Sequence, residues 1–387
     1  MLKSYKTELK PTEEQVRKIR QTIGTCRFIY NFYLGHNKEV YVNEQRFVSG
    51  MDFSVWLNNT FVPNNPEYRW IKDVSSKAVK QSIMNAEKAF KRFFKGQSKF
   101  PRFKKKSRQN VKAYFPKNNK YDWTCERHRV KIPTLGFVRL KEKGYIPASA
   151  DVRSGTVSVQ AGRYFVSVLV EEQERQPPNT EYTDGIGLDL GLKSFVVSSG
   201  RAKPFPSISK SKRVKKAERK LRREQKRLSR KYEKRKRGEK SATYSANINK
   251  QVKKVQALHL CLTNIKTDYL NKVVAELVKT KPAFITIEDL NVKGMMQNRH
   301  LARVIAGQKF YEFRTKITVK AKQLGIEVRV VDRFYPSSKL CSCCGVIKSD
   351  LKLSDRLYTC SSCGMAMDRD FNASQNLANA KTYKLAS

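Results

Sequence analysis

The stretch "CSCCGVIKSDLKLSDRLYTCSSCGMAMDRDFNASQNL", residues 341–377, contains five of the eight cysteines of this 387-residue chain. Four of the five follow the spacing C-x2-C-x15-C-x2-C, which is typical of four thiolates arranged tetrahedrally around Zn²⁺. The predicted ligands are Cys341, Cys344, Cys360 and Cys363. Four protein ligands leave no open coordination position, so the sequence predicts a zinc ion with a structural role.

The two cysteine pairs share one turn pattern. Each pair is followed by glycine, which lets the chain turn so that backbone amides can face the sulfurs. Because Cys344-Gly345 matches Cys363-Gly364, we assign Cys344 as a ligand and leave Cys343 out. A redox-active C-x-x-C pair is the alternative interpretation, but it does not explain two matched turns.

Three acidic residues stand in segments that otherwise favour burial. Asp189 lies within "IGLDLGL", Glu288 ends "FITIE", and Asp370 begins "DFNASQNLANA". A buried acid is costly unless a cation accompanies it, and Mg²⁺ is the natural cation for carboxylates contributed by several elements. Two such ions can activate water and stabilise the leaving oxygen in phosphodiester hydrolysis. The sequence therefore predicts a catalytic site with two Mg²⁺ ions at these three residues.

Each acid also has a structural explanation when taken alone. Asp370 could cap a helix, Asp189 could occupy a turn, and Glu288 could be a charge at the end of a strand. Three separated acids within one α/β half of the chain favour the joint interpretation. Asp368 precedes Asp370 by two residues, about 200° away on a helix, so both cannot face one metal pair if the helix has already begun.

The charge of the chain points to a polyanionic partner. Lys and Arg number 80 against 34 Asp and Glu, which gives a formal net charge of +46. A nucleic acid is the expected partner. A membrane surface is the competing interpretation, but the sequence has no amphipathic, Trp-rich helix and no apolar run of 18 residues. Since the N-terminus lacks the apolar core of a signal peptide, we expect a protein of the reducing cytoplasm.

The pattern of apolar residues changes along the chain. Residues 12–103 have helical periodicity, with Ala78, Ile83, Ala86, Phe90 and Phe94 expected on one buried side of a helix. Residues 111–172 alternate as strands and break at glycine, which predicts a small antiparallel sheet or barrel. The polar run 171–185 is typical of a linker, so we expect a domain boundary near Asp184.

The second half predicts an α/β domain. Buried strands are expected in "GIGLDLGLKSFVVSSG", "PAFITIEDLN" and "GIEVRVVDRFYPSS", and helices over 210–240 and 246–279 are expected to pack antiparallel. The first of these helices has 18 Lys and Arg against four Glu. A solvated helix is one interpretation, but this excess favours contact with phosphates. The candidate contact residues are Arg213, Lys216, Lys220, Arg223 and Arg227.

Several of these motifs together resemble TnpB, the transposon-associated nuclease family related to type V CRISPR effectors. The resemblance rests on "GLDLGLKSF", "ITIEDLNVKGM", "VVDRFYPSSKLCSCCG" and "CSSCGMAMDRDFNASQNL", and more loosely on "CRFIYNFYLGHN" and "SSKAVKQSIMNAEKAFKRFF". It implies an RNase H-like (RuvC) nuclease domain over 184–335 and 365–387, interrupted by a zinc finger over 336–364. It also implies a wedge-like β domain over 1–11 and 111–180 and a helical recognition domain over 12–110.

The same resemblance implies an activity and its partners. A guide RNA from the transposon end would direct cleavage of double-stranded DNA beside a short adjacent motif, and the protein would act as a monomer. Asp189, Glu288 and Asp370 resemble the three metal-binding carboxylates of the family. The segment "SSKAVKQS" resembles the one that reads the adjacent motif, which points to Lys77 and Gln81. These two residues lie four apart and can hydrogen-bond to base edges, although ordinary solvent exposure explains them nearly as well.

Three other activities stay open at this stage. An RNA-guided DNA-binding protein without cleavage would not need the three acids. A transposase of the same broad fold also uses three acids, and it differs in joining DNA ends rather than only cutting them. A structural RNA-binding protein with a zinc ribbon would leave the acids unexplained.

Overall fold

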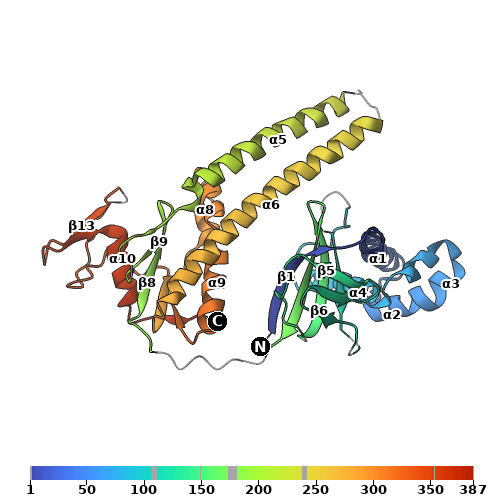
Figure 1. The fold of residues 1–387 in the computed structure, drawn as a ribbon, viewed down its shortest axis with the longest axis horizontal. Coiled ribbons are helices and arrows are strands. Elements are labelled where there is room, and N and C mark those ends of the chain that lie inside the picture. Colours follow the sequence, from blue (N-terminus) through green and yellow to red (C-terminus); the bar gives the residue numbers. More distant parts are fainter. Residues whose placement is uncertain are drawn as a thin grey trace. The chain divides into compact units, whose positions relative to one another are not determined.

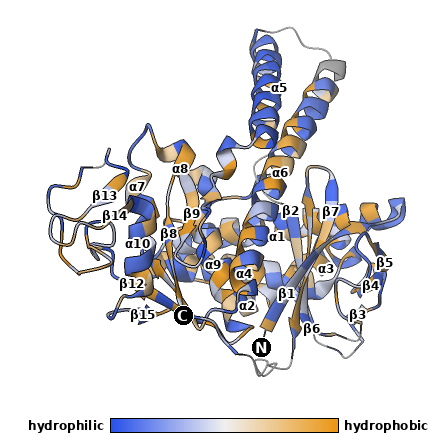
Figure 2. Ribbon diagram, turned by 60° about the vertical axis from the view of Figure 1, so that its left-hand side comes forward, coloured by the Kyte–Doolittle hydropathy of each residue, from blue (hydrophilic) through white to orange (hydrophobic). Residues whose placement is uncertain are grey.

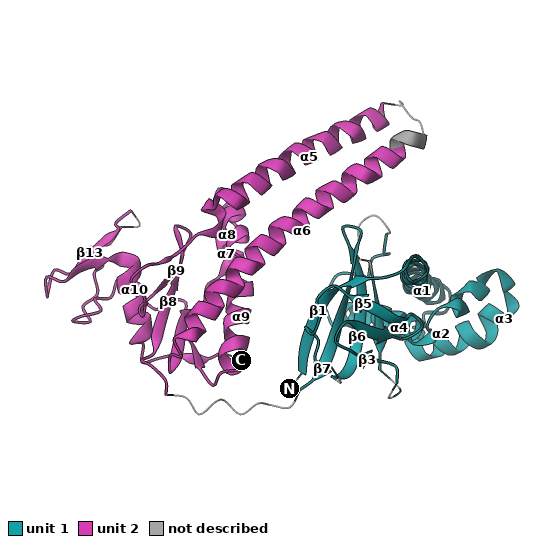
Figure 3. Cartoon of the chain, viewed as in Figure 1, with its two compact units in different colours: residues 1–174 teal, residues 175–387 magenta. Residues whose placement is uncertain are grey.

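A computed structural model of the chain describes residues 2–105, 111–117, 119, 121–148, 150–172, 181–237, 242–352 and 354–386. The chain divides into two compact units, residues 1–174 and 175–387 (Figure 3). The division falls ten residues before the predicted boundary at Asp184. Most of the predicted linker, residues 173–180, lies outside the described residues.

The helices of the first unit gather around an aromatic core. They are α1 (Glu13–Glu44), α2 (Gly50–Trp56), α3 (Val62–Asn64) and α4 (Ser76–Phe94), with a π-helical turn at Leu57–Phe61 and a 3-10 helix at Pro66–Asp73. A capping box begins α1, because the amide of Gln15 donates to the Thr12 side chain and the Gln15 side chain accepts from the Thr12 amide. The predicted buried side of α4 is confirmed except at Phe94. That ring is 58% exposed and stacks on Phe90 at the surface.

An antiparallel sheet completes the first unit. Its strands are β1 (Leu2–Lys10), β2 (Val111–Pro116), β3 (Thr124–Cys125), β4 (Arg129–Ile132), β5 (Gly136–Leu140), β6 (Asp151–Gln160) and β7 (Arg163–Glu171). The spatial order is β2-β6-β7-β1-β5-β4-β3, so the first strand of the chain lies at the centre. Ile19 and Ile23 of α1 and Ala78 of α4 belong to the same core as the sheet. Helices and sheet in this unit therefore stabilise one another.

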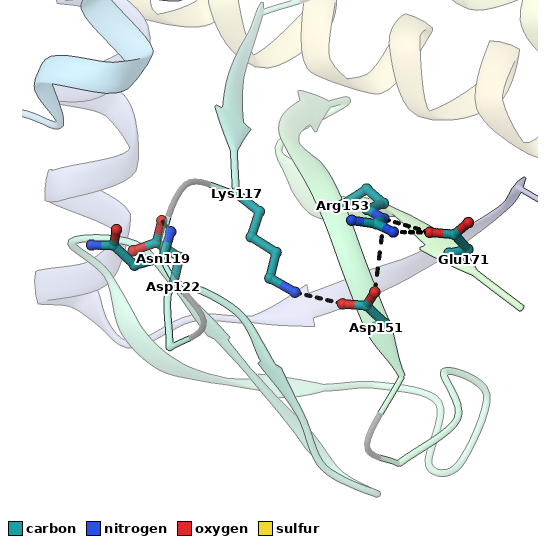
Figure 4. Close-up of polar contacts among 6 residues, drawn as sticks. All are labelled: Lys117, Asn119, Asp122, Asp151, Arg153 and Glu171. Atoms are coloured by element: carbon teal, nitrogen blue, oxygen red, sulfur yellow. Dashed lines mark hydrogen bonds and ion pairs between the residues drawn. The ribbon is translucent and has the colours of Figure 1, made fainter.

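Ion pairs line one end of this sheet (Figure 4). Lys117 donates to Asp151 across β2 and β6, and Arg153 Nε donates to Glu171 Oε2 at 2.6 Å across β6 and β7. Asp151, Arg153 and Glu171 are exposed, so solvent screens these pairs and they contribute little to stability. In the strand register Asp151 lies opposite Glu171, and Arg153 lies where the register shifts between Val152 and Ser154.

The second unit is built on a mixed sheet (Figure 1). Its strands are β8 (Ile186–Leu190), β9 (Ser194–Ser198), β10 (Phe205–Pro206), β11 (Phe284–Glu288), β12 (Glu327–Val331) and β15 (Lys384–Leu385). The order is β10-β9-β8-β11-β12-β15, and the central strands β8, β11 and β12 are parallel. The remaining helices are α5 (Lys212–Lys236), α6 (Ala242–Lys279), α7 (Val292–Met295), α8 (Ala302–Gln308), α9 (Phe310–Lys322) and α10 (Arg369–Ala378). The predicted α/β arrangement is confirmed.

The two faces of this sheet are covered differently. Leu188 and Ile287 pack against α6 and α9 in one large core. Gly187 lies on the opposite face, where a Cβ atom would come within 2.0 Å of the Ser374 carbonyl oxygen of α10. Because glycine leaves this space open, α10 rests directly on the backbone of β8.

Helices α5 and α6 form a long hairpin. Lys231 Nζ lies 3.4 Å from the carbonyl oxygen of Asn247, and Gln251 contacts Glu224, so the two helices are antiparallel as predicted. Val214 and Leu221 of α5 pack against Val255 and neighbouring apolar residues of α6. Most of α5 is hydrophilic (Figure 2). Among the described residues, no helix has both the length and the apolarity to cross a bilayer.

The close approach of α10 to β8 predicts a specific sensitivity. Gly187→Ala should destabilise the protein by about 1–3 kcal/mol, because the added methyl group would clash with backbone atoms that cannot move aside independently. Thermal and urea denaturation followed by circular dichroism measure this change. Gly35→Ala within α1 is the control, since its Cβ would meet nothing within 4 Å and should be neutral or stabilising by up to about 1 kcal/mol. Equal stability of the two variants would contradict the prediction.

Candidate active site and metal centre

The four predicted zinc ligands converge. Their sulfur atoms all lie within 4.8 Å of one another, with Cys341 Sγ 3.7 Å from Cys363 Sγ and Cys344 Sγ 3.6 Å from Cys360 Sγ. A tetrahedron with metal–sulfur bonds of about 2.3 Å has sulfur–sulfur edges of about 3.8 Å. The spacing therefore fits a tetrahedral thiolate site such as that of zinc. Cys343 is exposed and does not belong to the group.

Matched turns hold the two cysteine pairs. Gly345 and Gly364 have φ angles of 76° and 71°, and their amides donate to the carbonyl oxygens of Cys341 and Cys360. The backbone amides of Cys363 and Ser362 lower the pKa of the Cys360 thiol to about 6, which favours the thiolate that a metal requires. The second pair lies in the turn of a short hairpin, between β13 (Leu357–Thr359) and β14 (Ala366–Asp368), and β14 leads straight into α10.

Asp189 and Glu288 lie near the carboxyl ends of neighbouring parallel strands. Ile287 pairs with Leu188, so continuing the register by one residue brings Glu288 beside Asp189. Side chains alternate between the faces of a sheet. Since Leu188 faces α6 and α9, both acids face the side that α10 covers.

The two acids in "IEDL" have different surroundings. Glu288 accepts a hydrogen bond from Ser337 Oγ, and burial raises the pKa of its carboxyl group against the opposing effect of this bond. Asp289 accepts from Arg314 Nη1 at 2.7 Å and from Arg333 Nη2 at 3.3 Å. These guanidinium groups hold the pKa of Asp289 below its usual value, and the hydrogen bond from Arg314 has the largest effect. Asp289 is therefore an ion-pair partner, whereas Glu288 is the candidate metal ligand.

The "DRD" motif divides its roles between a cap and a candidate ligand. Asp368 is the N-cap of α10, because its Oδ1 accepts from the amides of Asp370 at 2.9 Å and Phe371 at 3.0 Å. The capping role considered for Asp370 is therefore wrong. Its carboxylate is not used by the cap and is the one acid in the first turn of the helix.

Helix geometry brings Asp370 toward the two strand acids. Ser374 lies over Gly187, and Asp370 precedes Ser374 by one helical turn, about 6 Å along the axis. Asp189 follows Gly187 by two residues on the same face, about 7 Å along the strand. The charges of Asp370, Arg369 and Asp368 all act on Asp189, so the first turn of α10 lies at the level of Asp189.

The charges of Glu288 and Asp370 act on Asp189. Burial, followed by the charges of Glu288 and Asp370, raises the pKa of Asp189 to about 8. The three residues therefore share one electrostatic environment, which is the usual setting for bound cations. Among the described residues, the cysteine quartet is nevertheless the one group whose ligand atoms come close enough to hold a metal ion as they stand.

Two buried asparagines that the sequence interpretation missed link the cysteine centre to α10. Asn372 Nδ2 donates to the Leu340 carbonyl at 2.7 Å, and Asn376 Nδ2 donates to the same oxygen at 2.6 Å and to that of Ser337 at 2.7 Å. Both side chains are at most 2% exposed. The signal was present in "DFNASQNLANA", where amides recur at helical spacing on an otherwise apolar side.

The two candidate base-reading residues on α4 have different surroundings. Lys77 Nζ lies 3.0 Å from Asp122 Oδ2, which also accepts from the Asn119 amide; Figure 4 shows Asn119 and Asp122. Gln81 donates to Asn85 Oδ1 at 3.2 Å and lines a cavity of about 250 Å³ together with Lys104 and Lys112. Asp122 therefore holds Lys77 by an ion pair, whereas Gln81 borders a basic cavity.

The five candidate phosphate contacts on α5 are exposed. They are Arg213, Lys216, Lys220, Arg223 and Arg227. Arg227 pairs with Glu224 at 2.9 Å. Glu224 is itself 4% exposed and accepts from Gln251 of α6, so it belongs to the hairpin interface rather than to the basic surface.

The cysteine centre yields a test with an internal control. Cys360→Ser should abolish stoichiometric zinc and lower the melting temperature, because three thiolates hold zinc poorly and the hairpin before α10 depends on the site. Cys343→Ser should keep one zinc per chain and the wild-type melting temperature. Elemental analysis and differential scanning calorimetry measure both quantities. Full zinc content in Cys360→Ser would refute the assignment.

The raised pKa of Asp189 predicts a pH-dependent stability. Between pH 3.8 and about 8 the folded chain keeps a proton that the unfolded chain has released, so this residue lowers stability as the pH rises. Asp189→Asn should therefore stabilise the protein when no divalent cation is added, and increasingly so from pH 5 to pH 8. Urea denaturation across this range measures the difference. A difference that is constant with pH would contradict the prediction.

Comparison with known proteins places these features in a family. Family models match residues 310–377 ("Cas12f1-like, TNB domain"), 166–299 ("Probable transposase") and 1–46 ("Helix-turn-helix domain"). In the structure, residues 2–44 are the strand β1 and the single long helix α1 rather than two short helices. The structure titled "Cryo-EM structure of the Cas12f1-sgRNA-target DNA complex" shares the fold, with a TM-score of 0.58 and 13% identity over 99% of both chains.

Two curated relatives match along nearly the whole chain, and a third matches a shorter part of it. The "Putative RNA-guided DNA endonuclease" of Streptomyces pristinaespiralis is 32% identical over 98% of this chain and 89% of its own length. The "Putative RNA-guided DNA endonuclease InsQ" of Escherichia coli (strain K12) is 31% identical over 100% of this chain and 94% of its own. "TnpB-like protein L79" of Acanthamoeba polyphaga mimivirus is 38% identical over 34% of this chain and 26% of its own. The resemblance found in the motifs is confirmed, and the chain belongs to the TnpB family.

Proposed function

We propose that this protein is an RNA-guided, Mg²⁺-dependent endonuclease that cleaves double-stranded DNA beside a short adjacent motif. The observation that supports the proposal is that β8, β11 and α10 pack together and carry Asp189, Glu288 and Asp370, with the charges of Glu288 and Asp370 acting on Asp189. Carboxylates from three separate elements, two of them with a raised pKa, suit a site that binds divalent cations. The names of the full-length relatives support the same activity.

The three carboxylates would hold the ions, and the surrounding residues would keep them in place. Ser337 holds Glu288 by a hydrogen bond, and Asn372 and Asn376 hold α10 against the segment before the cysteine centre. Two Mg²⁺ ions bound there would supply an activated water and a stabilised leaving oxygen for phosphodiester hydrolysis. Because protons and cations compete for the raised-pKa carboxylates, cleavage should need more Mg²⁺ at lower pH.

In this proposal the units have distinct tasks. Residues 184–335 and 365–387 form a RuvC-like nuclease domain, and residues 336–364 form a structural zinc finger. The wedge-like β part comprises residues 1–11 and 111–180, and the helical recognition part comprises residues 12–110. The shared core of these two parts supports their action as one body. The adjacent motif would be read near Gln81, with Lys77 recruited from Asp122.

The net charge supports a guide RNA as the partner that selects the target. A charge of +46 would be neutralised by a structured RNA, and base pairing would then read the target sequence. The exposed basic side of α5 offers one surface for its phosphates, and we propose one protein monomer per RNA. Sequencing the RNA that co-purifies with the protein at moderate salt tests this directly. A discrete species ending in a variable stretch is expected, whereas random cellular RNA would refute the guide.

The "DRD" motif provides the sharpest test of the catalytic site. Asp370→Asn in the protein–RNA complex should lower the cleavage rate of a matched target at least about 100-fold, because even the hydrogen-bond partners of metal ligands contribute about 10- to 100-fold. Asp368→Asn should stay within about threefold of the wild type, since asparagine caps a helix as well as aspartate. Single-turnover cleavage of linear DNA measures both rates.

The products of the same reactions separate the remaining activities. Cut ends alone are expected. Joined DNA ends would instead indicate a transposase, and target binding without cleavage by the wild type would indicate a guided binding protein. Similar losses in the Asp370→Asn and Asp368→Asn variants would refute the assignment of Asp370.

A further inference from the structure

Phe334 stands out at the edge of the acid site. It follows β12 by three residues, and its side chain is 86% exposed, the highest fraction among the large apolar side chains that the structure describes. A single exposed apolar side chain is common on protein surfaces. What distinguishes Phe334 is the hydrogen-bonded loop that presents it.

The loop is fixed on both sides of the ring. The Phe334 amide donates to Asp332 Oδ1 at 2.9 Å, and the Tyr335 amide donates to the Asp332 carbonyl at 3.1 Å, so Asp332 closes a tight turn. The Tyr335 hydroxyl donates to the Asn376 carbonyl of α10 at 3.1 Å. Phe334 therefore has a fixed backbone although its ring contacts little of the protein.

The same loop is attached to the elements that carry the acids. Arg333 contacts the side chain and the carbonyl oxygen of Asp289, the residue after Glu288. Ser337 donates to Glu288 itself. Val331, at the end of β12, pairs with Glu288 in the sheet. The ring is thus presented from a loop that is anchored to Glu288 and to α10.

We propose that Phe334 is a stacking platform for an unpaired base of the DNA strand that enters the acid site. This inference rests on the proposed function. An aromatic ring can stack on any base because every base has a π-face, and such stacking has little sequence preference. Bases within a duplex are already stacked on their neighbours, so an isolated ring selects a strand that has been opened.

The surroundings of the ring favour a nucleotide over a protein partner. A protein interface needs a contiguous apolar patch, whereas the residues on the N-terminal side of Phe334, Asp332 and Arg333, are exposed and polar. The chain carries a net charge of +46, which attracts a phosphate backbone. Stacking one base would fix the sugar–phosphate beside it relative to the carboxylates. Phe334 would then be a strand-positioning residue rather than a metal ligand.

Cleavage kinetics of the protein–RNA complex test this role. Phe334→Ala should lower the single-turnover cleavage rate about tenfold at saturating Mg²⁺, and Phe334→Trp should restore it to near the wild-type rate. Affinity for the target should change less than twofold, because guide pairing provides most of the binding. Tyr311→Ala is the matched control, since this α9 side chain is 79% exposed and should leave the rate unchanged.

A fluorescence measurement separates stacking from a merely structural effect. 2-Aminopurine is placed, one position at a time, in the strand around the cut sites mapped for the wild type, and Asp189→Asn keeps the DNA intact. At one or two positions the 2-aminopurine fluorescence should be quenched when the protein has Phe334. It should be at least about twofold higher when the protein also has Phe334→Ala.

The outcomes distinguish this inference from the proposed function. A wild-type rate in Phe334→Ala, no rescue by Phe334→Trp, or unchanged 2-aminopurine fluorescence would each overturn the stacking role while leaving the nuclease assignment intact. A change in oligomeric state with Phe334→Ala, measured by light scattering, would show that the ring serves a protein contact and would also overturn it. Absence of cleavage by the wild type would instead refute the proposed function.

Discussion

The close contact between α10 and the backbone of β8 is the constraint on which the second unit depends. A glycine at 187 lets the helix lie directly on the strand, and the strand and helix spacings then set Asp189 and Asp370 at the same level. The remaining parts secure this contact. Asp368 starts the helix, Asn372 and Asn376 hold it against the chain before the cysteine centre, and the core of α6 and α9 fixes the sheet from the other face. The site is therefore a consequence of packing as much as of the three acids.

Much of this could be predicted from the sequence, and the reasons are specific. The cysteine quartet has a spacing that few other functions require, and the acids stand out because charge is costly among apolar residues. Periodicity predicted the α/β order and the antiparallel hairpin. No local pattern could predict that Asp289 pairs with two arginines or that Lys77 pairs with Asp122, because these partners are distant in sequence. The division of roles within "DRD" depended on where the helix begins. Phe94 was expected to be buried because the helical period continues to the last turn, where the core ends.

Charge is organised differently in the two units. In the first unit, ion pairs along the sheet ends and the Lys77–Asp122 contact partly neutralise lysines and arginines. On α5, the buried Glu224 accepts from Gln251 of α6, and most of the basic residues on the outer side are exposed to solvent. A hairpin of this kind has a small apolar seam and a large charged surface, so its position would respond strongly to the polyanion it meets.

The positions of the three acids in the sequence also determine when the acid site can form during protein synthesis. Asp189 leaves the ribosome 181 residues before Asp370, and the polypeptide between them includes the whole basic hairpin and the cysteine centre. Domains generally fold as units, the N-terminal one first, so the first unit can fold while the third carboxylate is still untranslated. A nascent or prematurely terminated product would thus be able to engage a polyanion before it could hydrolyse one.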